Sequence, residues 1–273
     1  MSRPITKDKI NDALRIAQLA AMEAGDFALE QFTRVHVLKE KPMTKDLFTS
    51  VDIECEKRIV KILKKNFPNH TLLTEERRLP QKLKNYAWWV DPLDGSVSYV
   101  FNLPYWGVSL ALIYAGEPIL GVSYFPQPRD LYWATKGGGA FLNYKKISVA
   151  GHKKVVDGII GIDYGYRDER EEGVKDVTKK ISDEVKYLVT YACTAASIAL
   201  VAEGKLVGYV HHMARRFDCA AGALLVTEAG GRVTDTSGNP IDWRDTKPVH
   251  FTCTNRKTHK ELISILNKSS ITL

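Results

Sequence analysis

Two carboxylates lie three positions apart directly after an apolar run, at Asp91 and Asp94 of the segment W-W-V-D-P-L-D-G-S. Clustered negative charge of this kind calls for a cation, and hard divalent ions bind such oxygen ligands. The intervening proline stiffens the turn, so the carbonyl of Leu93 can also face an ion. Gly95 and Ser96 then offer backbone N–H groups, expected at the start of a helix, where phosphate binds. The segment predicts that metal and phosphate meet within one turn, although an ordinary Asp-rich turn has the same composition.

Acidic residues also stand next to two other segments that suit a metal site. The segment L-L-T-E-E ends an apolar run on Glu75 and Glu76, and R-F-D-C-A-A-G places Asp218 at the head of an Ala/Gly-rich helix. A lone Asp at the head of a helix is most often an N-cap. Together with the two aspartates above, however, Glu75 and Asp218 supply about as many carboxylates as a pair of divalent ions requires.

Phosphate monoesters are the substrates that such a site would suit. The ester dianion repels an incoming nucleophile and neutral water is a weak one, so hydrolysis requires charge neutralisation and a source of hydroxide. Paired divalent ions about 4 Å apart provide both. Mg²⁺ is the expected ion, because every candidate ligand is an oxygen and the site is open to substrate.

Three segments resemble the signature motifs of the inositol monophosphatase superfamily, in the same order and at similar separations: T-E-E, D-P-L-D-G-S and F-D-C-A-A-G-A-L-L-V-T-E-A-G-G. The resemblance spans roughly Lys41 to Gly231, which is most of the chain. It implies a magnesium-dependent, lithium-sensitive phosphomonoesterase of layered α-β-α-β-α architecture that acts as a homodimer.

The same resemblance implies how the metal ligands are shared. Glu75, Asp91 and the carbonyl of Leu93 would bind a first ion, and Asp91, Asp94 and Asp218 a second. A third, weaker site would use Glu75 and waters, so two to three Mg²⁺ ions are expected in each active site. Asp94 and Asp218 would also face the substrate.

The resemblance assigns further roles around the phosphate. Ser96, hydrogen-bonded by Asp52, would orient the attacking water, and the backbone of Gly95 and Ser96 would hold the phosphate. The segment D-L-F-T-S-V-D, which ends at Asp52, matches the family's D-L-V-T-x-x-D. On sequence grounds alone, Asp52 is equally an acidic residue in the first turn of a helix, where the helix dipole stabilises negative charge.

Departures from the family pattern concern the substrate. Ser96 replaces the usual Thr and keeps the hydroxyl, whereas H-H-M at 211–213 stands where the animal enzymes carry a Glu that contacts inositol hydroxyls. Arg215 resembles a basic residue of archaeal members that hydrolyse both inositol-1-phosphate and fructose-1,6-bisphosphate. An Arg there could hold a second phosphate by bidentate hydrogen bonds, although a surface Arg would look the same.

For further candidate site residues, a simpler interpretation without a functional role is also available. Lys41 aligns with a family lysine near the third ion, but a solvated loop lysine is the simpler interpretation. Glu76 either assists through water or is a solvated neighbour. Tyr164, Arg167 and Arg216 are further candidates for substrate contact. If residues 206–211 form a strand that continues through His212, the two adjacent histidines point to opposite faces and are not a metal pair.

Two other functions remain open. A nucleotide 3′-phosphatase acting on adenosine 3′,5′-bisphosphate would belong to the same superfamily, but such enzymes usually carry D-G-T-K-G-F, which D-G-S-V-S-Y does not match. A regulatory protein that binds RNA or the transcription machinery, as some bacterial relatives do, is the alternative from another class. The intact set of carboxylates argues for catalysis.

Hydrophobic periodicity predicts elements that alternate along the chain, without repeats or a linker. Mixed α/β structure follows, with one catalytic domain over 1–273 whose N-terminal lobe, about 1–150, carries the first motifs and whose C-terminal lobe, about 151–273, carries Asp218. The expected helices are 6–32 (with Thr6 able to cap), 49–66, 169–182, 195–202, 218–229 and 257–266, and the expected strands are 71–74, 86–90, 105–114, 119–125, 131–136, 158–162, 187–190, 206–211 and 249–252.

Composition excludes several other classes. Hydrophobic residues make up 44% and charged residues 26%, as in soluble globular proteins, and no apolar run is long enough to span a membrane. The four cysteines form no C-x-x-C pair, which argues against a zinc site or a disulfide framework. The net charge of +7 comes from dispersed lysines, so we expect attraction for small anionic substrates such as phosphorylated polyols or sugars, without nucleic acid or membrane partners. A signal peptide is not evident, and the expected compartment is the cytoplasm.

Overall fold

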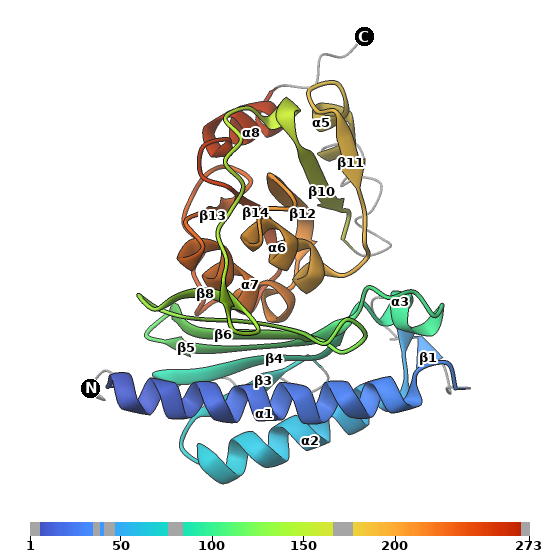
Figure 1. The fold of residues 1–273 in the computed structure, drawn as a ribbon, viewed down its shortest axis with the longest axis vertical. Helices are drawn as coiled ribbons and strands as arrows, with labels where there is room; N and C mark the ends of the chain where they lie inside the picture. The colour runs from blue at the N-terminus through green and yellow to red at the C-terminus, as the bar shows by residue number, and fades with distance from the viewer. Residues whose placement is uncertain (1–5, 35–38, 41–46, 76–83, 166–176, 269–273) are drawn as a thin grey trace.

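The computed structural model describes residues 6–34, 39–40, 47–75, 84–165 and 177–268. Helices and sheets stack in five layers, in the order helices, sheet, helices, sheet, helices (Figure 1). Three hydrophobic clusters fill the spaces between these layers. The layered mixed α+β architecture predicted from the sequence is confirmed.

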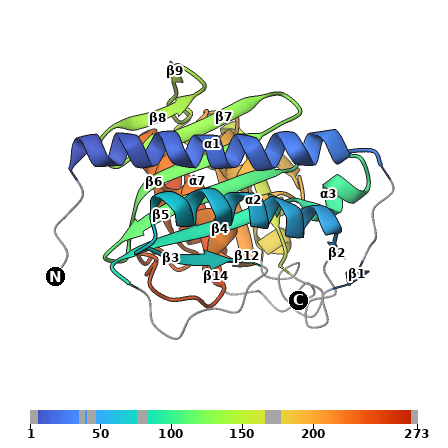
Figure 2. The same ribbon diagram turned by 90° about the horizontal axis from the view of Figure 1, so that it is seen from below.

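Helices α1 (Lys7–Gln31) and α2 (Ser50–Asn66) form the first layer and cover one face of the larger sheet (Figure 2). A stripe of fully buried alanines lets α1 pack closely, at positions 13, 17, 20, 21, 24 and 28. Thr6 occupies the N-cap position of α1 and its carbonyl accepts the N–H of Ile10 at 3.0 Å, but its side chain makes no capping hydrogen bond. Packing of the alanine face, rather than a side-chain cap, holds this helix.

The larger sheet has seven strands in the order β3-β4-β5-β6-β7-β8-β9, of which only the β3–β4 pair is parallel. Neighbouring side chains of β4 enter different cores: Trp88 packs with α1 and α2, and Trp89 packs on the opposite face. The strand bounds are β3 Thr71–Thr74, β4 Tyr86–Asp94, β5 Gly107–Tyr114, β6 Glu117–Phe125, β7 Asp130–Thr135, β8 Gly139–Leu142 and β9 Lys145–Lys146.

Strand β4 is longer than predicted and carries an irregularity where the sequence suggested its end. Pairing with β5 continues past Val90, but the register shifts between Asp91 and Asp94. Pro92 has no N–H to donate to the ladder, so the chain bulges there instead of leaving the sheet. The bulge keeps both aspartates attached to a rigid strand.

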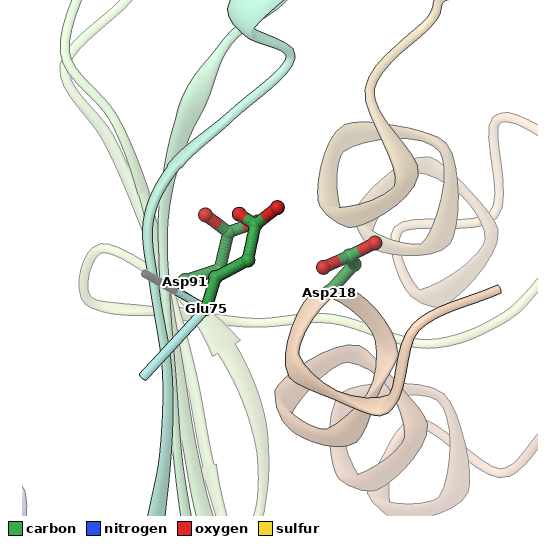
Figure 3. Close-up of side chains that lie close together, drawn as sticks. All are labelled: Glu75, Asp91 and Asp218. Carbon is green, nitrogen blue, oxygen red and sulfur yellow. The ribbon is translucent and has the colours of Figure 1, made fainter. Parts of the chain in front are cut away.

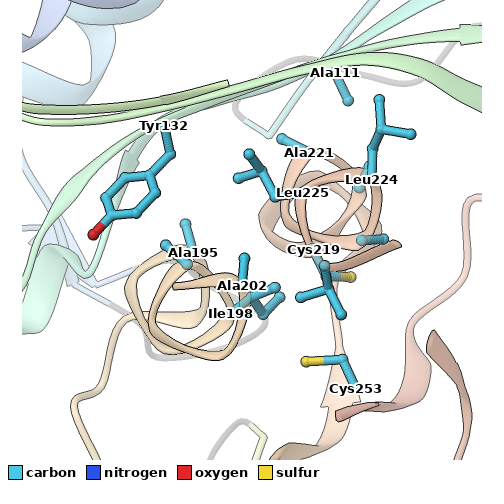
Figure 4. Packing of buried hydrophobic residues seen from close by; sticks show 14 of the residues in the cluster. Ala111, Tyr132, Ala195, Ile198, Ala202, Cys219, Ala221, Leu224, Leu225 and Cys253 are labelled. Atoms are coloured by element: carbon cyan, nitrogen blue, oxygen red, sulfur yellow. The ribbon is translucent and has the colours of Figure 1, made fainter. Parts of the chain in front are cut away.

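Helices α6 (Thr194–Ala202) and α7 (Arg216–Glu228) form the middle layer (Figure 4). Small residues permit close packing: a Cβ on Gly222 would lie 2.5 Å from a methyl carbon of Ile198. Helix α7 begins at Arg216, so Asp218 lies within its first turn instead of opening the helix. Gly230, with φ of 93°, follows the end of the helix, where an αL glycine commonly stands.

The smaller sheet orders its strands β11-β10-β12-β14-β13, with β10 parallel to both neighbours. Helices α5 and α8 cover its outer face (Figure 1). The helix predicted at 169–182 falls partly outside the described residues, and its described end is α5. The bounds are β10 Ile159–Asp163, α5 Lys179–Ser182, β11 Tyr187–Val189, β12 Gly208–Ala214, β13 Arg232–Asp235, β14 Val249–Thr254 and α8 His259–Leu266.

Three short elements complete the description: α3 (Ser96–Val100), a 3₁₀ turn at Val155–Asp157, and a two-stranded ribbon of β1 (Lys39–Glu40) with β2 (Leu47–Phe48). Across the described ranges, the helices are all too short or too polar to cross a lipid bilayer.

Candidate functional site

Three carboxylates from separate elements converge between the larger sheet and the middle helices (Figure 3). One ligand atom from each of Glu75, Asp91 and Asp218 lies within 4.8 Å of the other two. Glu75 directly follows β3, and its N–H donates to the carbonyl of Val90 on the parallel neighbour β4. Asp218 reaches the same space from the first turn of α7. These three residues are called the carboxylate cluster below.

Burial and like charge make the carboxylate cluster unfavourable without a cation. Asp91 is 1% exposed and Asp218 is 5% exposed. Burial, followed by the negative charges of Glu75, Asp218 and Asp94, raises the pKa of Asp91 well above its usual range, although the N–H of Leu93 donates to its Oδ1 at 3.0 Å. An all-oxygen, acidic, buried set of this kind fits a hard divalent ion such as Mg²⁺.

Asp94 lines the same cavity but is held by a different element. Its Oδ2 accepts the backbone N–H of Ala195 at 2.6 Å and the thiol of Cys193 at 3.1 Å, both at the start of α6. Burial raises the pKa of Asp94 to about 6, and the N–H of Ala195 opposes that shift. Asp94 is therefore fixed in orientation by α6, while its predicted role as a metal ligand stays a prediction.

Ser96 and Asp52 form the contact that the sequence suggested. The hydroxyl of Ser96 lies 3.1 Å from Asp52 Oδ1 and 3.0 Å from the carbonyl oxygen of Leu93. The other oxygen of Asp52 accepts the backbone N–H of Thr49 at 2.9 Å, as part of a capping box on α2. Asp52 thus stabilises its own helix and contacts Ser96 at once.

Position 95 requires a residue without a side chain, which is glycine. Its φ is 82°, and a Cβ there would lie 2.5 Å from the carbonyl oxygen of Tyr105. Only glycine adopts this tight left-handed turn against a backbone without strain. The turn joins the end of β4 to α3 and places Ser96 at the first position of that helix.

A cavity of about 440 Å³ extends from the carboxylate cluster to the edge of the smaller sheet. A second wall of this cavity includes Asp163, Thr194 and His211, which form a buried hydrogen-bonded network with Tyr209 behind them. The hydroxyl of Tyr209 donates to Asp163 Oδ2 at 2.8 Å and lies 3.1 Å from Nδ1 of His211. Thr194 Oγ1 lies 3.1 Å from the same nitrogen.

The pKa shifts in this network also follow from burial. Burial raises the pKa of Asp163 to about 7 against the opposing hydrogen bond from Tyr209, and it lowers the pKa of His211 to about 3. His211 is therefore a neutral ring at physiological pH. His212, the next residue of β12, lies against His250 instead, with ring centroids 4.6 Å apart, which agrees with side chains that alternate between the faces of a strand.

Sequence reasoning missed Asp163, Thr194, Tyr209 and Cys193 as cavity or supporting residues. Asp163 ends the apolar strand β10, and an acidic residue at the carboxyl end of a buried strand was a usable signal. Thr194, Tyr209 and Cys193 carry no comparable signal, because small or aromatic residues in apolar segments are ordinary core residues.

The remaining candidates are placed as follows. The guanidinium of Arg215 pairs with Glu75 and is not among the residues lining the cavity, whereas Tyr164 does line it. Arg216 is 6% exposed and lies 3.6 Å from a carboxylate oxygen of Asp245, so it is a buried structural residue. Lys41, Glu76 and Arg167 lie outside the described residues.

Comparison with known proteins adds independent findings. The model of the inositol monophosphatase family matches residues 10–270. The chain is 30% identical over 265 residues to a fructose-1,6-bisphosphatase/inositol-1-monophosphatase of Aquifex aeolicus, covering 96% of this chain and 97% of that protein. It is 28% identical over 260 residues to the Nus factor SuhB of Pseudomonas aeruginosa, covering 93% and 95%. The crystal structure of the extragenic suppressor protein SuhB from Bartonella henselae superposes with a TM-score of 0.86 at 26% identity, covering 94% of this chain and 99% of that one.

Proposed function

The chain belongs to the inositol monophosphatase family, and on that premise we propose that it is a Mg²⁺-dependent phosphomonoesterase hydrolysing inositol-1-phosphate, fructose-1,6-bisphosphate or both by attack of water. The observation that carries this proposal is the convergence of Glu75, Asp91 and Asp218 within 4.8 Å. The Aquifex relative, whose name includes both activities, supports the choice of substrates. Action in the cytoplasm and assembly as a homodimer belong to the same proposal.

The proposed ligand sets follow the family pattern. Glu75, Asp91 and the Leu93 carbonyl would hold one ion, and Asp91, Asp94 and Asp218 another, with Glu75 contributing to a third, weaker site. Bound Mg²⁺ supplies charge neutralisation and a more acidic water. The N–H of Ala195 and the thiol of Cys193 fix one oxygen of Asp94, which leaves the carboxylate in a single orientation.

Residues around the turn at Gly95 would handle phosphate and water. Gly95 and Ser96 line the cavity, and their backbone N–H groups, at the left-handed turn before α3, would bind a phosphate oxygen. Ser96, in contact with Asp52 at 3.1 Å, would orient the attacking water through its hydroxyl oxygen. Asp52 is 1% exposed, so its position is set by packing and capping rather than by solvent.

A substrate panel with and without Mg²⁺ tests the proposal. We expect phosphate release from inositol-1-phosphate or fructose-1,6-bisphosphate only when Mg²⁺ is present, and its loss in Asp94→Asn with the fold retained by circular dichroism. Wild-type turnover in that variant would contradict the assigned role. Preferential release from adenosine 3′,5′-bisphosphate would instead favour a nucleotide 3′-phosphatase.

A regulatory role is supported by the relative named Nus factor SuhB. Such a protein would bind RNA or the transcription machinery, with phosphatase activity as a minor property. Gel-shift titration with structured RNA and pull-down with purified RNA polymerase distinguish the two functions. Tight binding together with negligible turnover on the whole substrate panel would favour the regulatory role.

A further inference from the structure

Arg215 places a permanent positive charge at the carboxylate cluster. Its Nη1 donates to Oε1 of Glu75, and the side chains of Arg215 and Glu75 are only 18% and 10% exposed. Water therefore screens this ion pair less than it would a surface pair. A guanidinium stays protonated at any physiological pH, so its charge is always present.

The backbone of Arg215 is fixed by the same helix that carries Asp218. Arg215 is the N-cap residue of α7, and its carbonyl accepts the N–H of Asp218 at 3.3 Å and the thiol of Cys219 at 3.1 Å. Its side chain crosses from α7 to the end of β3. Arg215 therefore links two of the three elements that supply the carboxylate cluster, and it cannot move far without disturbing α7.

The described residues that line the cavity include no lysine or arginine, so Arg215 is the basic side chain in contact with the carboxylate cluster in this part of the structure. A divalent cation that enters the carboxylate cluster must approach Glu75, whose Oε1 already accepts a hydrogen bond from the guanidinium. Two cations at one carboxylate repel each other, and the repulsion is strong where burial lowers the effective dielectric constant.

We propose that Arg215 weakens metal binding at the carboxylate cluster, acting as a built-in counter-ion that stabilises the metal-free protein and limits its affinity for divalent cations. The inference rests on the proposed function for the identity of the metal site. It goes beyond that function because it makes metal occupancy depend on a residue that is not a ligand. Substrate hydrolysis would then follow the free Mg²⁺ concentration more closely than in a protein with a neutral residue at this position.

Isothermal titration calorimetry with Mg²⁺, or Mn²⁺ titration followed by electron paramagnetic resonance, tests this without substrate. Arg215→Gln removes the charge and should bind the ion about tenfold more tightly than wild type. Arg215→Lys keeps the charge and should stay within about threefold of wild type. Arg244→Gln is the matched control, because Arg244 forms an exposed ion pair with Asp242 and should leave affinity unchanged.

Thermal unfolding gives a second readout. In chelator, Arg215→Gln should unfold at a lower temperature than wild type, because the ion pair between Arg215 and Glu75 is lost. Saturating Mg²⁺ should shrink this difference. An equal loss of stability with and without Mg²⁺ would contradict the proposal. If the Gln variant does not fold, Arg215→Met removes the charge and retains the length of the side chain.

The outcomes separate this inference from the proposed function. If Arg215→Gln binds Mg²⁺ with unchanged or weaker affinity than wild type, the inference alone is overturned. A tenfold or larger weakening would mean that Arg215 supports metal binding by holding Glu75 in the orientation of a ligand. Absence of metal binding by the wild-type protein would overturn the proposed function and this inference together.

Discussion

The carboxylate cluster and the hydrogen-bonded network both contribute residues to the lining of one cavity, yet each stabilises buried acid differently. In the carboxylate cluster, burial and then the like charges nearby raise the pKa of Asp91, and ligand atoms of the three carboxylates lie within 4.8 Å of one another. In the hydrogen-bonded network, the hydroxyl of Tyr209 faces Asp163 and the ring of His211 completes the polar contacts. In the carboxylate cluster, three close carboxylates face the guanidinium of Arg215, whereas the network pairs Asp163 with a neutral hydroxyl.

This difference indicates that the stability of the carboxylate cluster depends more on a bound cation than that of the hydrogen-bonded network. Three close carboxylates gain most from a divalent ion, because the ion removes repulsion and provides ligand bonds together. A buried carboxylate that already accepts a hydrogen bond from a hydroxyl gains less stability from a bound ion. Metal binding and stability should therefore respond differently to substitutions in the two walls.

The largest expected effect is the loss of catalysis in Asp91→Asn. Mg²⁺-dependent phosphate release should fall by about 10³-fold or more, because the residue is expected to serve two ions at once. The metal-free variant should be at least as stable as wild type, since a buried negative charge is removed. Phosphate release and urea unfolding in chelator measure both effects, with the exposed Asp157→Asn as control. Retained turnover, or a large loss of stability in the metal-free protein, would contradict the view that the carboxylate cluster depends on a bound cation.

A smaller effect is the pH dependence of stabilisation by Mg²⁺. The pKa of Asp94 is raised to about 6 and that of Asp91 is raised as well, so protons compete with the ion at low pH. Carboxyl groups with raised pKa values stabilise the metal-free fold below about pH 4, and this contribution is lost as pH rises through about 6. The gain in unfolding free energy on adding Mg²⁺ should therefore increase from about pH 5 to about pH 7.

Urea unfolding with and without Mg²⁺ across this pH range measures that gain, and taking the difference cancels titrations remote from the metal. Asp157→Asn should leave the pH dependence unchanged, because Asp157 is exposed and is not among the residues lining the cavity. A gain in unfolding free energy that does not vary with pH would show that protons and metal do not share the cluster.

The smallest effect should come from Tyr209→Phe in the hydrogen-bonded network. Tyr209 is fully buried, and its hydroxyl contacts Asp163, His211 and Thr194. Its loss should lower the free energy of unfolding by about 1–3 kcal/mol and leave Mg²⁺ affinity within about twofold of wild type. Tyr132→Phe is the matched control, because that buried hydroxyl bonds Glu203 away from the cavity. A marked change in Mg²⁺ affinity would mean that the two walls are coupled.

The motifs predicted much of the site because their chemistry is local. The D-P-L-D-G-S segment combines acidic residues, a proline and a glycine in one turn, and the structure places Gly95 at φ of 82° and Ser96 at the start of α3. The contact between Asp52 and Ser96 came from family resemblance, since 44 positions separate the two residues. Hydrophobic periodicity located most helices and strands but missed the continuation of β4 beyond Val90, because the bulge at Pro92 depends on pairing with β5.

What the sequence determined by itself is the set of carboxylates, the order of the elements and the mixed α/β class, because residue type, turn chemistry and periodicity act over a few neighbouring positions. The layered arrangement was implied by the family resemblance. Only the tertiary structure decided that Glu75, Asp91 and Asp218 share one space while α6 holds Asp94, that Arg215 pairs with Glu75, and that Asp163 and Tyr209 belong to the hydrogen-bonded network. Those relations join β3, β4, α6, α7 and the smaller sheet, and they depend on how whole layers pack across a shared core.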